Sequence, residues 1–376
     1  MNKICHITTG MNIGGAEIFM LNLAISLNAL GYKQQIISLQ GRGDLSGKLS
    51  NSDIELIHLG ISRYPWTWWA ILKLPFLLRK ISPEIIQTWL YHADLIGGLA
   101  SIFTQANLIW NIRQTDISAK NNKNEIVLVA KIAAALSKYL PKKIICCSES
   151  VEASHVNIGY MKSKFVVIPN GCDTNVYKPD KVARDATRLM LGIDEGDIVI
   201  GRFGRFDPQK DYANFISAGD RIFSKCKNVW FLMAGENVSF ENPELRQLIS
   251  SSDAHDRYML LGKRTDLPDI YQSVDIMVSS SLGEGFPNVV AEAMACEVPC
   301  VVTDVGESAS LVGDTGRTVP KKDVTKLADA CLNMVEIGAI GRQKLGSAAR
   351  SRIIKYYSMD RSVTEYRALY DQMPEK

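Results

Sequence analysis

Short apolar runs alternate with longer amphipathic stretches along the first half of the chain. Stretches such as Ala16–Leu30, Ala93–Phe103 and Ile126–Tyr139 have the apolar spacing of helices. Apolar strands that alternate with such helices are typical of a parallel sheet covered on both faces. The predicted strands are Ile4–Thr8, Gln35–Leu39, Ile54–Leu59, Ile85–Thr88, Leu108–Ile112, Lys143–Cys147 and Phe165–Ile168.

The same alternation starts again after a break. The break, Asn170–Glu195, is rich in turn-forming residues and contains Pro179 and Gly192. From Asp323 onward the pattern predicts helices only. The second set of predicted strands is Ile198–Phe203, Val229–Met233, Tyr258–Leu261, Ile276–Ser280 and Pro299–Thr303.

We therefore predict an α/β protein with two Rossmann-like, doubly wound parallel-sheet domains. The domains occupy residues 1–170 and 197–354, with a linker at 171–196 and a C-terminal helix at 355–376 for which packing back on the first domain is considered. Ligands of open parallel sheets bind outside the carboxyl ends of the strands. Two such domains facing each other would share a cleft, so the strand-to-helix junctions are the places to search for a site.

The charge distribution gives a weak indication of partners. The net charge of +3 is too small to indicate nucleic acid. Residues 1–170 hold 17 Lys and Arg against 10 Asp and Glu, whereas the remainder holds 26 against 30. A basic first half could face anionic lipid or an anionic acceptor, and it could equally be a solvated surface with no partner.

Cysteine usage and hydropathy indicate the cytoplasm. None of the eight cysteines forms a C-x-x-C pair, which is the pattern of buried apolar thiols in a reducing compartment. A polar loop follows the first strand, so we expect no signal peptide. The longest apolar stretch, Trp66–Leu78, is shorter than the ~18–20 residues that span a bilayer.

Two junctions offer anion-binding chemistry. Gly14 and Gly15 lie between the first strand and its helix, where backbone N–H groups suit a phosphate. Arg205 and Lys210 follow the first strand of the second domain, and a guanidinium fork with an ammonium suits a diphosphate. Without support from other motifs, each could be an ordinary turn.

A third junction carries two carboxylates. Glu284 follows the strand Ile276–Ser280, and Glu292 lies two turns along the next helix among apolar neighbours. Carboxylates accept hydrogen bonds from the hydroxyl pairs of sugars and riboses. The alternative is a helix cap and a surface glutamate, but a charge in so apolar a helix would be buried and would need a partner. The connecting loop is Gly285, Phe286, Pro287, Asn288 and Val289, with Pro287 at the expected helix start.

His92 is the fourth candidate. It closes a strand and opens a helix, where a helix N-terminus favours the neutral imidazole. A structural histidine is the alternative. The chain has no D-x-D sequence and no His/Asp cluster with metal-ligand spacing. We therefore expect no metal and no other cofactor, and a leaving diphosphate would be neutralised by the basic residues and amides named above.

Together these motifs resemble the retaining glycosyltransferases of family four, which have the GT-B architecture. The resemblance spans nearly the whole chain. It rests on Gly14–Glu17, the Val167–Gly171 segment, the Arg205/Lys210 pair, the two glutamates and the Ala293–Pro299 run, in that order. The segments Gln87–Leu95 and Trp110–Arg113 are similar to a bacterial polysaccharide-assembly branch of the family. Glu297 and Gln114 depart from the pattern, because Gly and His are usual there.

The resemblance implies a role for each candidate. Arg205 and Lys210 would bind the donor diphosphate, with Gly15 closing over it, and Glu292 would hold the ribose. Glu284 would contact the donor sugar, with His92 beside it, and no nucleophile is assigned. Arg264 is our candidate for the nucleobase. The donor would be a nucleotide sugar, UDP favoured over GDP, and the acceptor a glycan or lipid-linked saccharide of lipopolysaccharide or capsule biosynthesis.

Other functions remain open at this point. A nucleotide-sugar epimerase or a glycosyl phosphorylase could use the same architecture. A nicotinamide-dependent dehydrogenase is disfavoured because no G-x-G-x-x-G follows a strand. A scaffold without activity is disfavoured by the full set of acidic and basic candidates.

One segment suggests contact with a membrane surface. Arg63–Lys80 combines Trp and Leu with basic ends, as interfacial segments do. An ordinary core helix kinked at Pro75 is the alternative. The localisation we expect is cytoplasmic, with peripheral attachment to the inner face of the membrane as a hypothesis.

Overall fold

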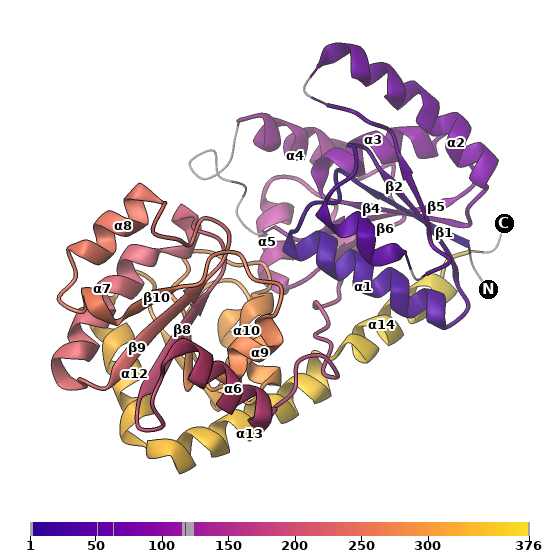
Figure 1. The fold of residues 1–376 in the computed structure, drawn as a ribbon. Helices are drawn as coiled ribbons and strands as arrows, with labels where there is room; N and C mark the ends of the chain where they lie inside the picture. The colour runs from indigo at the N-terminus through magenta and orange to yellow at the C-terminus, as the bar shows by residue number, and fades with distance from the viewer. Residues whose placement is uncertain (1–2, 51, 63, 115–116, 118–123, 375–376) are drawn as a thin grey trace. The chain divides into compact units, whose positions relative to one another are not determined.

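The computed structural model describes residues 3–50, 52–62, 64–114, 117 and 124–374. The chain forms two compact units; in Figure 1 the first comprises the indigo-to-magenta part and the yellow C-terminal helix, and the second comprises the part between them, from pink through orange to yellow. The first unit contains residues 1–171 and 359–376, and the second contains residues 172–358. Each unit has a hydrophobic core of its own.

The first unit is built on a parallel sheet in the order β3-β2-β1-β4-β5-β6-β7 among the described residues. The strands are β1 Lys3–Thr8, β2 Lys33–Ser38, β3 Glu55–His58, β4 Ile85–Trp89, β5 Asn107–Ile112, β6 Lys143–Cys146 and β7 Phe165–Val167. The α-helices are α1 Gly15–Ala29, α2 Lys73–Ile81, α3 Tyr91–Ser101, α4 Asn124–Leu136, α5 Glu149–Asn157 and α14 Met359–Asp371. Three 3-10 helices lie at Asp44–Leu49, Pro65–Leu72 and Lys162–Lys164.

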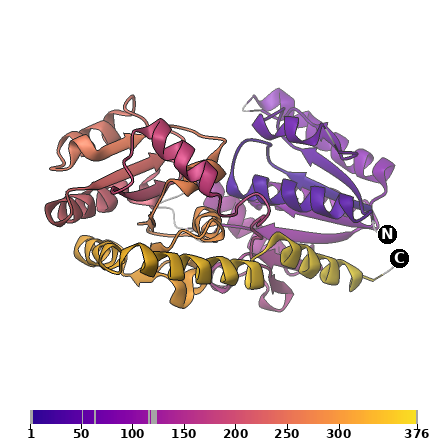
Figure 2. The same cartoon turned by 60° about the horizontal axis from the view of Figure 1, so that its bottom comes forward.

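The last helix, α14, completes the core of the first unit. It lies beside α1 (Figure 2), and Val363 and Leu369 join the same apolar cluster as Leu23. Two tyrosine hydroxyls fix its register on the sheet. Tyr366 Oη accepts a hydrogen bond from Asn111 Nδ2 at 2.7 Å, and Tyr370 donates to Gln87 at 2.5 Å.

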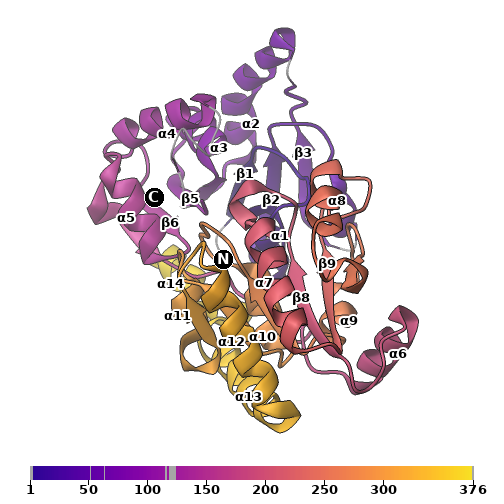
Figure 3. The same ribbon diagram turned by 90° about the vertical axis from the view of Figure 1, so that its left-hand side faces the viewer.

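The second unit repeats the design, with the parallel order β10-β9-β8-β11-β12-β13 in its described residues. Helices α7 and α12 pack side by side over this sheet (Figure 3). The strands are β8 Ile198–Phe203, β9 Val229–Ala234, β10 Tyr258–Leu260, β11 Ile276–Ser279, β12 Cys300–Thr303 and β13 Arg317–Val319. The α-helices are α6 Lys181–Leu191, α7 Tyr212–Lys225, α8 Pro243–Ser250, α9 Leu267–Gln272, α10 Asn288–Ala295, α11 Ser308–Val312, α12 Val324–Glu336 and α13 Gly338–Tyr356. Short 3-10 helices lie at Pro208–Lys210, His255–Arg257 and Gly313–Thr315.

Among the described residues, the sequence predicted every strand except β13, with bounds that differ by at most two residues. β13 is only three residues long and Thr318 is exposed, so it has no apolar run to detect. The helical reading beyond Asp323 is confirmed by α12, α13 and α14.

The segment 171–196 is not a free linker. It belongs to the second unit, because α6 packs on α9 and Arg188 is buried in an ion pair with Asp275. The preceding turn is held by Arg350, whose guanidinium donates to the carbonyl oxygens of Thr174 and Tyr177. The turn-forming residues of the segment 171–196 therefore cover one side of the hydrophobic core of the second unit.

Glu297, which stands where the family usually has glycine, adopts a backbone conformation that favours glycine. Glu297 follows α10 with φ at +63°, a left-handed conformation that glycine adopts without strain. Its carbonyl oxygen lies against the backbone of Gly346 in α13, where a Cβ would come within 1.9 Å. Close packing of α10 on α13 therefore depends on the missing side chain at Gly346.

We expect Gly346→Ala to destabilise the second unit. The new methyl group would overlap a backbone carbonyl that cannot rotate away, and overpacking of this kind costs about 1–3 kcal/mol. Urea unfolding of this variant and of Gly196→Ala measures the effect. Gly196 is exposed and has open space around it, so the control should stay within about 0.5 kcal/mol of wild type. Equal stability of the two variants would contradict the close approach.

Candidate functional site

Each sheet has one point where the chain reverses the side to which it adds strands. In the second unit this switch point lies between β8 and β11, and in the first between β1 and β4. Loops that leave the carboxyl ends of such strands diverge and leave room for a ligand. In the second unit these two connections carry Lys210 and Glu284, and in the first they lead into the helix starts at Gly15 and His92.

Lys210 and Glu284 form an ion pair at the second switch point. Lys210 Nζ lies 2.5 Å from Glu284 Oε1, and the hydroxyl of Ser281 donates to the same oxygen at 2.6 Å. Only 9% of the Glu284 side chain is exposed. Burial raises the pKa of Glu284, but the Lys210 ammonium and the Ser281 hydrogen bond outweigh burial, so the pKa is lowered overall.

The backbone ties the two loops together around this pair. Leu282 N donates to Gln209 O at 2.7 Å, and Ser280 Oγ donates to the carbonyl oxygens of Lys210 and Asp211 at 3.0 Å. Gly306 closes the site from the β12–α11 loop. Its left-handed backbone lies so close to the Glu284 carbonyl that a Cβ would come within 1.6 Å. The position of Glu284 is thus fixed by three loops.

Arg205 does not join this pair. Its side chain is 61% exposed, and its Nε donates to Asp207 Oδ2 at 3.1 Å. The sequence placed Arg205 and Lys210 together as one basic turn, whereas the structure gives each cation a different carboxylate partner. Both remain at the same switch point, because they lie five positions apart along one loop.

Glu292 occupies a second polar position in the same unit. It lies on α10 and accepts a hydrogen bond from the Tyr271 hydroxyl of α9 at 2.9 Å. Burial raises the pKa of Glu292, and hydrogen bonds from Tyr271 and Tyr177 oppose this. Glu292 is partly rather than fully buried, and the Tyr271 hydroxyl supplies a hydrogen-bond partner for its carboxylate.

The loop from Gly285 to Val289 leads from one glutamate to the other. Phe286 is buried, with its ring 5.8 Å from that of Tyr357. Pro287 precedes α10, which begins at Asn288, so the proline lies one residue earlier than predicted. Its φ of −81° and ψ of 85° are outside the helical region, which explains the difference.

Arg264, the nucleobase candidate, is held by a neighbour in its own loop. Its Nε and Nη2 donate to the two carboxylate oxygens of Asp266 at 2.8 and 2.5 Å. About a third of the side chain is exposed. The planar face of the guanidinium is consequently fixed in direction by a two-point contact.

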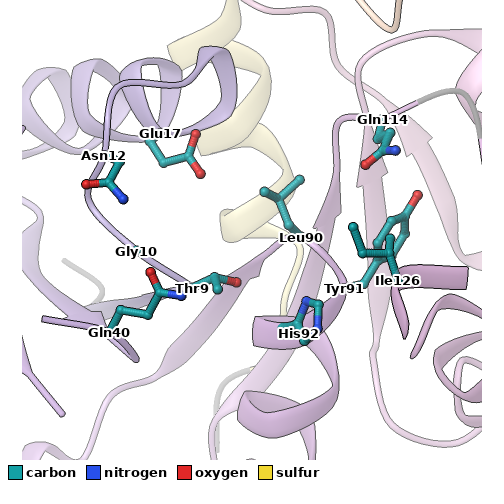
Figure 4. Close-up of a pocket in the computed structure, with 10 residues that line it drawn as sticks. All are labelled: Thr9, Gly10, Asn12, Glu17, Gln40, Leu90, Tyr91, His92, Gln114 and Ile126. Atoms are coloured by element: carbon teal, nitrogen blue, oxygen red, sulfur yellow. The ribbon is translucent and has the colours of Figure 1, made fainter. Parts of the chain in front are cut away.

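The first unit contains a pocket at its own switch point (Figure 4). Its volume is about 220 Å³. The side chains that line it are polar in majority and include one carboxylate, that of Glu17. The lining consists of Thr9, Gly10, Asn12, Glu17, Gln40, Leu90, Tyr91, His92, Gln114 and Ile126.

The glycine pair lies beside this pocket, but a carboxylate covers it. Gly14 is the N-cap of α1 and Gly15 its first residue. A Cβ on Gly14 would come within 2.3 Å of Glu17 Oε2, so that carboxylate lies over the helix N-terminus. An anion could bind the amides there only after Glu17 turns away.

His92 is the second residue of α3 and lines the same pocket. Its Nε2 lies 3.4 Å from Glu125 Oε1, and a third of the side chain is exposed. Leu90, just before α3, has φ at +67°, which is unusual for a branched side chain and bends the chain sharply into the helix. The pocket therefore brings His92 and Glu17 to one site.

Several residues of these sites were not predicted from the sequence. Tyr271 and Ser281 had no pattern that marked them. Arg202 did have one, because a charged residue interrupts the otherwise apolar strand β8. Glu17 was visible beside the glycine pair, but its sequence position did not reveal that it folds back over Gly14.

Within the described residues, no group of three His, Cys, Asp or Glu side chains is arranged to hold a metal ion. None of the helices in the described ranges combines the length and the apolar character needed to cross a membrane.

Two family models match the chain, one in each half. Residues 13–176 match the model described as Glycosyltransferase Family 4, and residues 197–336 match that of Glycosyl transferases group 1. The two matches together cover most of the chain. With the two Rossmann-like sheets, they show that this protein belongs to glycosyltransferase family 4 and has the GT-B fold.

Individual relatives agree with this assignment. A lipopolysaccharide core biosynthesis mannosyltransferase of Rhizobium meliloti is 26% identical over 63% of this chain and 68% of its own. The Escherichia coli UDP-Gal:alpha-D-GlcNAc-diphosphoundecaprenol alpha-1,3-galactosyltransferase is 22% identical over 81% and 79%. The crystal structure of Anabaena HepE in complex with UDP-glucose has a TM-score of 0.86 at 20% identity, covering 99% and 100%.

We expect Lys210→Met to lower stability in a pH-dependent way. The variant leaves the buried Glu284 carboxylate without its cation, which should cost about 1–3 kcal/mol at pH 7. Because the folded-state pKa of Glu284 is lowered, the pair stabilises the protein above the unfolded pKa and stops doing so as pH falls through the folded one. The difference from wild type should therefore shrink below pH 4.5.

Urea unfolding at pH 7 and at pH 4 measures this difference. The double variant Lys210→Met/Glu284→Gln is the control, because it removes both charges and should recover part of the loss at pH 7. A loss that is equal at both pH values would show that the ion pair is not its source.

Proposed function

We propose that this glycosyltransferase moves a sugar from a nucleoside diphosphate donor to a glycan or lipid-linked saccharide, with retention of anomeric configuration. The process we propose is the biosynthesis of a cell-surface polysaccharide such as lipopolysaccharide or capsule. The observation that carries the proposal is the Lys210–Glu284 pair, positioned by three loops at the β8/β11 switch point. The Rhizobium meliloti and Escherichia coli relatives are both named as sugar transferases, which favours transfer over epimerisation, phosphorolysis or dehydrogenation.

The donor diphosphate would bind at Lys210 and Arg205. Both cations are held by carboxylates of their own unit, at 2.5 and 3.1 Å. A diphosphate carries more charge than a carboxylate, so it competes for both cations at once. Negative charge grows on the leaving phosphate as the glycosidic bond breaks, and cations held in place stabilise it without divalent metal.

The two glutamates would then have different partners. Glu284 would be released toward the hydroxyls of the donor sugar when Lys210 turns to the diphosphate. Glu292, whose carboxylate already accepts hydrogen bonds from Tyr271 and Tyr177, would accept the ribose hydroxyls on its remaining lone pairs. The backbone N–H groups of the loop Gly285–Val289 would face the sugar and phosphate, and Arg264 would face the base. We assign no enzymic nucleophile.

The donor we favour carries UDP. Anabaena HepE was crystallised with UDP-glucose, and the Escherichia coli relative is named for UDP-galactose. The base, the sugar and the absence of a cofactor are proposals for this chain.

The pocket of the first unit would bind the acceptor. Its lining offers amides, hydroxyls, one carboxylate and His92. This set matches the neutral hydroxyl groups of a saccharide, since amides and carboxylates both accept hydrogen bonds from hydroxyls. His92 would lie beside the reacting sugar. The amides of Gly14 and Gly15 would serve an anion only after Glu17 turns away.

A panel of nucleotide sugars tests the main proposal. Each donor is incubated with the protein in a chelator, and nucleoside diphosphate release and thermal stabilisation are followed. A donor at 100 times its Kd should stabilise the protein by about 2.7 kcal/mol. Stabilisation and slow release without metal are expected. Turnover that disappears in chelator and returns with Mg²⁺ or Mn²⁺ would overturn the metal-independent mechanism.

Separate substitutions of the two glutamates test their roles. Glu292→Gln should weaken binding of the bare nucleoside diphosphate about 10-fold, because one charged hydrogen bond contributes about 1.5–3 kcal/mol. Glu284→Gln should affect that binding less and mainly lower turnover of the intact donor. Calorimetry with UDP ranks the two variants. Equal losses of affinity would contradict the separate assignments.

We also propose that the first unit attaches to an anionic membrane surface in the cytoplasm. Trp69, Leu72 and Phe76 expose 58–73% of their surface, and Ile102 and Phe103 at the end of α3 expose 60% and 55%. We call these five residues the apolar patch. Arg79 joins its two parts, because its Nε donates to Phe103 O at 2.9 Å. Lys73 and Lys80 on α2 are exposed as well, which adds charge complementary to anionic lipid.

Arg63, at the start of the segment predicted from sequence, lies outside the described residues. The patch also includes Ile102 and Phe103, which follow α3 and were not part of that segment. Helix α2 buries Leu74, Leu78 and Ile81. It therefore contributes both to the core of the first unit and, through its exposed side chains, to the proposed membrane contact.

Flotation with vesicles tests the patch. We expect binding to vesicles that contain anionic lipid, and its loss in Trp69→Ser/Phe76→Ser, since burying two such side chains contributes several kcal/mol. Val182→Ser/Leu189→Ser on α6 is the matched control, because these apolar side chains are equally exposed but lie in the second unit. Flotation of the patch variant at the wild-type level would contradict the proposal.

A further inference from the structure

Arg202 is a charged residue near the carboxyl end of a buried strand. It is the fifth residue of β8 and only 1% of it is exposed. Its neighbours in the strand are apolar or glycine, and β8 is hydrogen-bonded on both sides. Charged side chains are rarely buried so fully without a counter-ion.

The guanidinium of Arg202 joins the two ends of the loop that carries Arg205 and Lys210. Its Nη1 donates to Phe203 O at 2.7 Å, and its Nη2 donates to Lys210 O at 2.5 Å. The same group lies 4.6 Å from the centre of the Tyr212 ring, and the Tyr212 hydroxyl donates to Gly204 O at 2.5 Å. Both ends of the loop are therefore held by side chains of β8 and α7.

The positive charge of Arg202 has no fixed counter-ion. Among the described residues, no carboxylate oxygen lies within 4.0 Å of its guanidinium nitrogens, and its buried Nε has no hydrogen-bond partner. The contrast is Arg188 in the same unit, which is also buried but pairs with Asp275 at 3.2 Å. An unpaired buried cation is costly to stability, so a negative group supplied from elsewhere would be favoured beside it.

The positive charge of Arg202 also acts on Glu284. Burial raises the pKa of Glu284, whereas Lys210, Ser281 and, after them, Arg202 lower it. Arg202 thus acts on Glu284 without a direct contact, and it stays in place when Lys210 moves.

We propose that Arg202 is a positioning residue of the donor site: it holds the Lys210 loop in shape and supplies permanent positive potential there. When a diphosphate draws Lys210 away from Glu284, the fixed charge of Arg202 remains and still favours the ionised form of that carboxyl group. The charge also adds to the attraction of the diphosphate. This inference rests on the proposed function, since it needs a donor diphosphate at Lys210.

The test compares Arg202→Met with Arg188→Met. Both variants remove a buried arginine from the second unit, but only Arg202 touches the Lys210 loop. Calorimetry gives the affinity of each protein for UDP and for uridine, which lacks the phosphates. We expect Arg202→Met to lower the UDP/uridine affinity ratio about 10-fold or more. Arg188→Met should lower the melting temperature and leave the ratio within about twofold of wild type.

Arg202→Lys distinguishes the effect of the positive charge from the effect of the two guanidinium hydrogen bonds. It keeps the potential but cannot reach both carbonyl oxygens, so the affinity ratio should fall less than in the Met variant while donor turnover still drops. A wild-type ratio in folded Arg202→Met overturns the inference. If Arg202→Met does not fold, a wild-type ratio and wild-type turnover in Arg202→Lys overturn it. If wild type binds no nucleoside diphosphate, the proposed function fails first, and the two failures are distinguishable.

Discussion

The Lys210–Glu284 pair is the interaction on which the second unit's site depends. A carboxylate that is 9% exposed stays ionised only because an ammonium and a hydroxyl are held against it. That requirement explains why three loops converge there, and why Gly306 must approach the backbone of Glu284 so closely. It also gives the site its chemical logic. A cation held by a buried carboxylate is already desolvated and positioned, so an incoming diphosphate exchanges one anionic partner for another.

The fold was largely predictable from the sequence, and the reasons are physical. Parallel strands buried on both faces are continuous apolar runs, which locate β1 and β8 to within a residue. Elements without a continuous apolar run were not predicted or were assigned to the wrong kind of segment. β13 is short and half polar, and turn-forming residues at 171–196 concealed a helix that packs on α9. Turn composition shows where the chain bends, but it does not show whether the bend is covered by other elements.

The candidate site was predictable in its residue types but not in its pairings. Loops at carboxyl strand ends carried Lys210, Glu284 and His92, as parallel topology requires. The sequence could not show that Lys210 pairs with Glu284 and Arg205 with Asp207, because both pairings depend on loop conformation. Nor could it show Glu17 folded over Gly14. Arg202 was the detectable omission, since a charge within an apolar strand is a signal that needs no structure.

A crystal structure with UDP tests the central claim most directly. The account predicts diphosphate oxygens on Lys210 Nζ and on the Arg205 guanidinium, the Lys210–Glu284 contact of 2.5 Å broken, and the ribose hydroxyls on Glu292. UDP bound away from the β8/β11 switch point, with Lys210 still on Glu284, would contradict it.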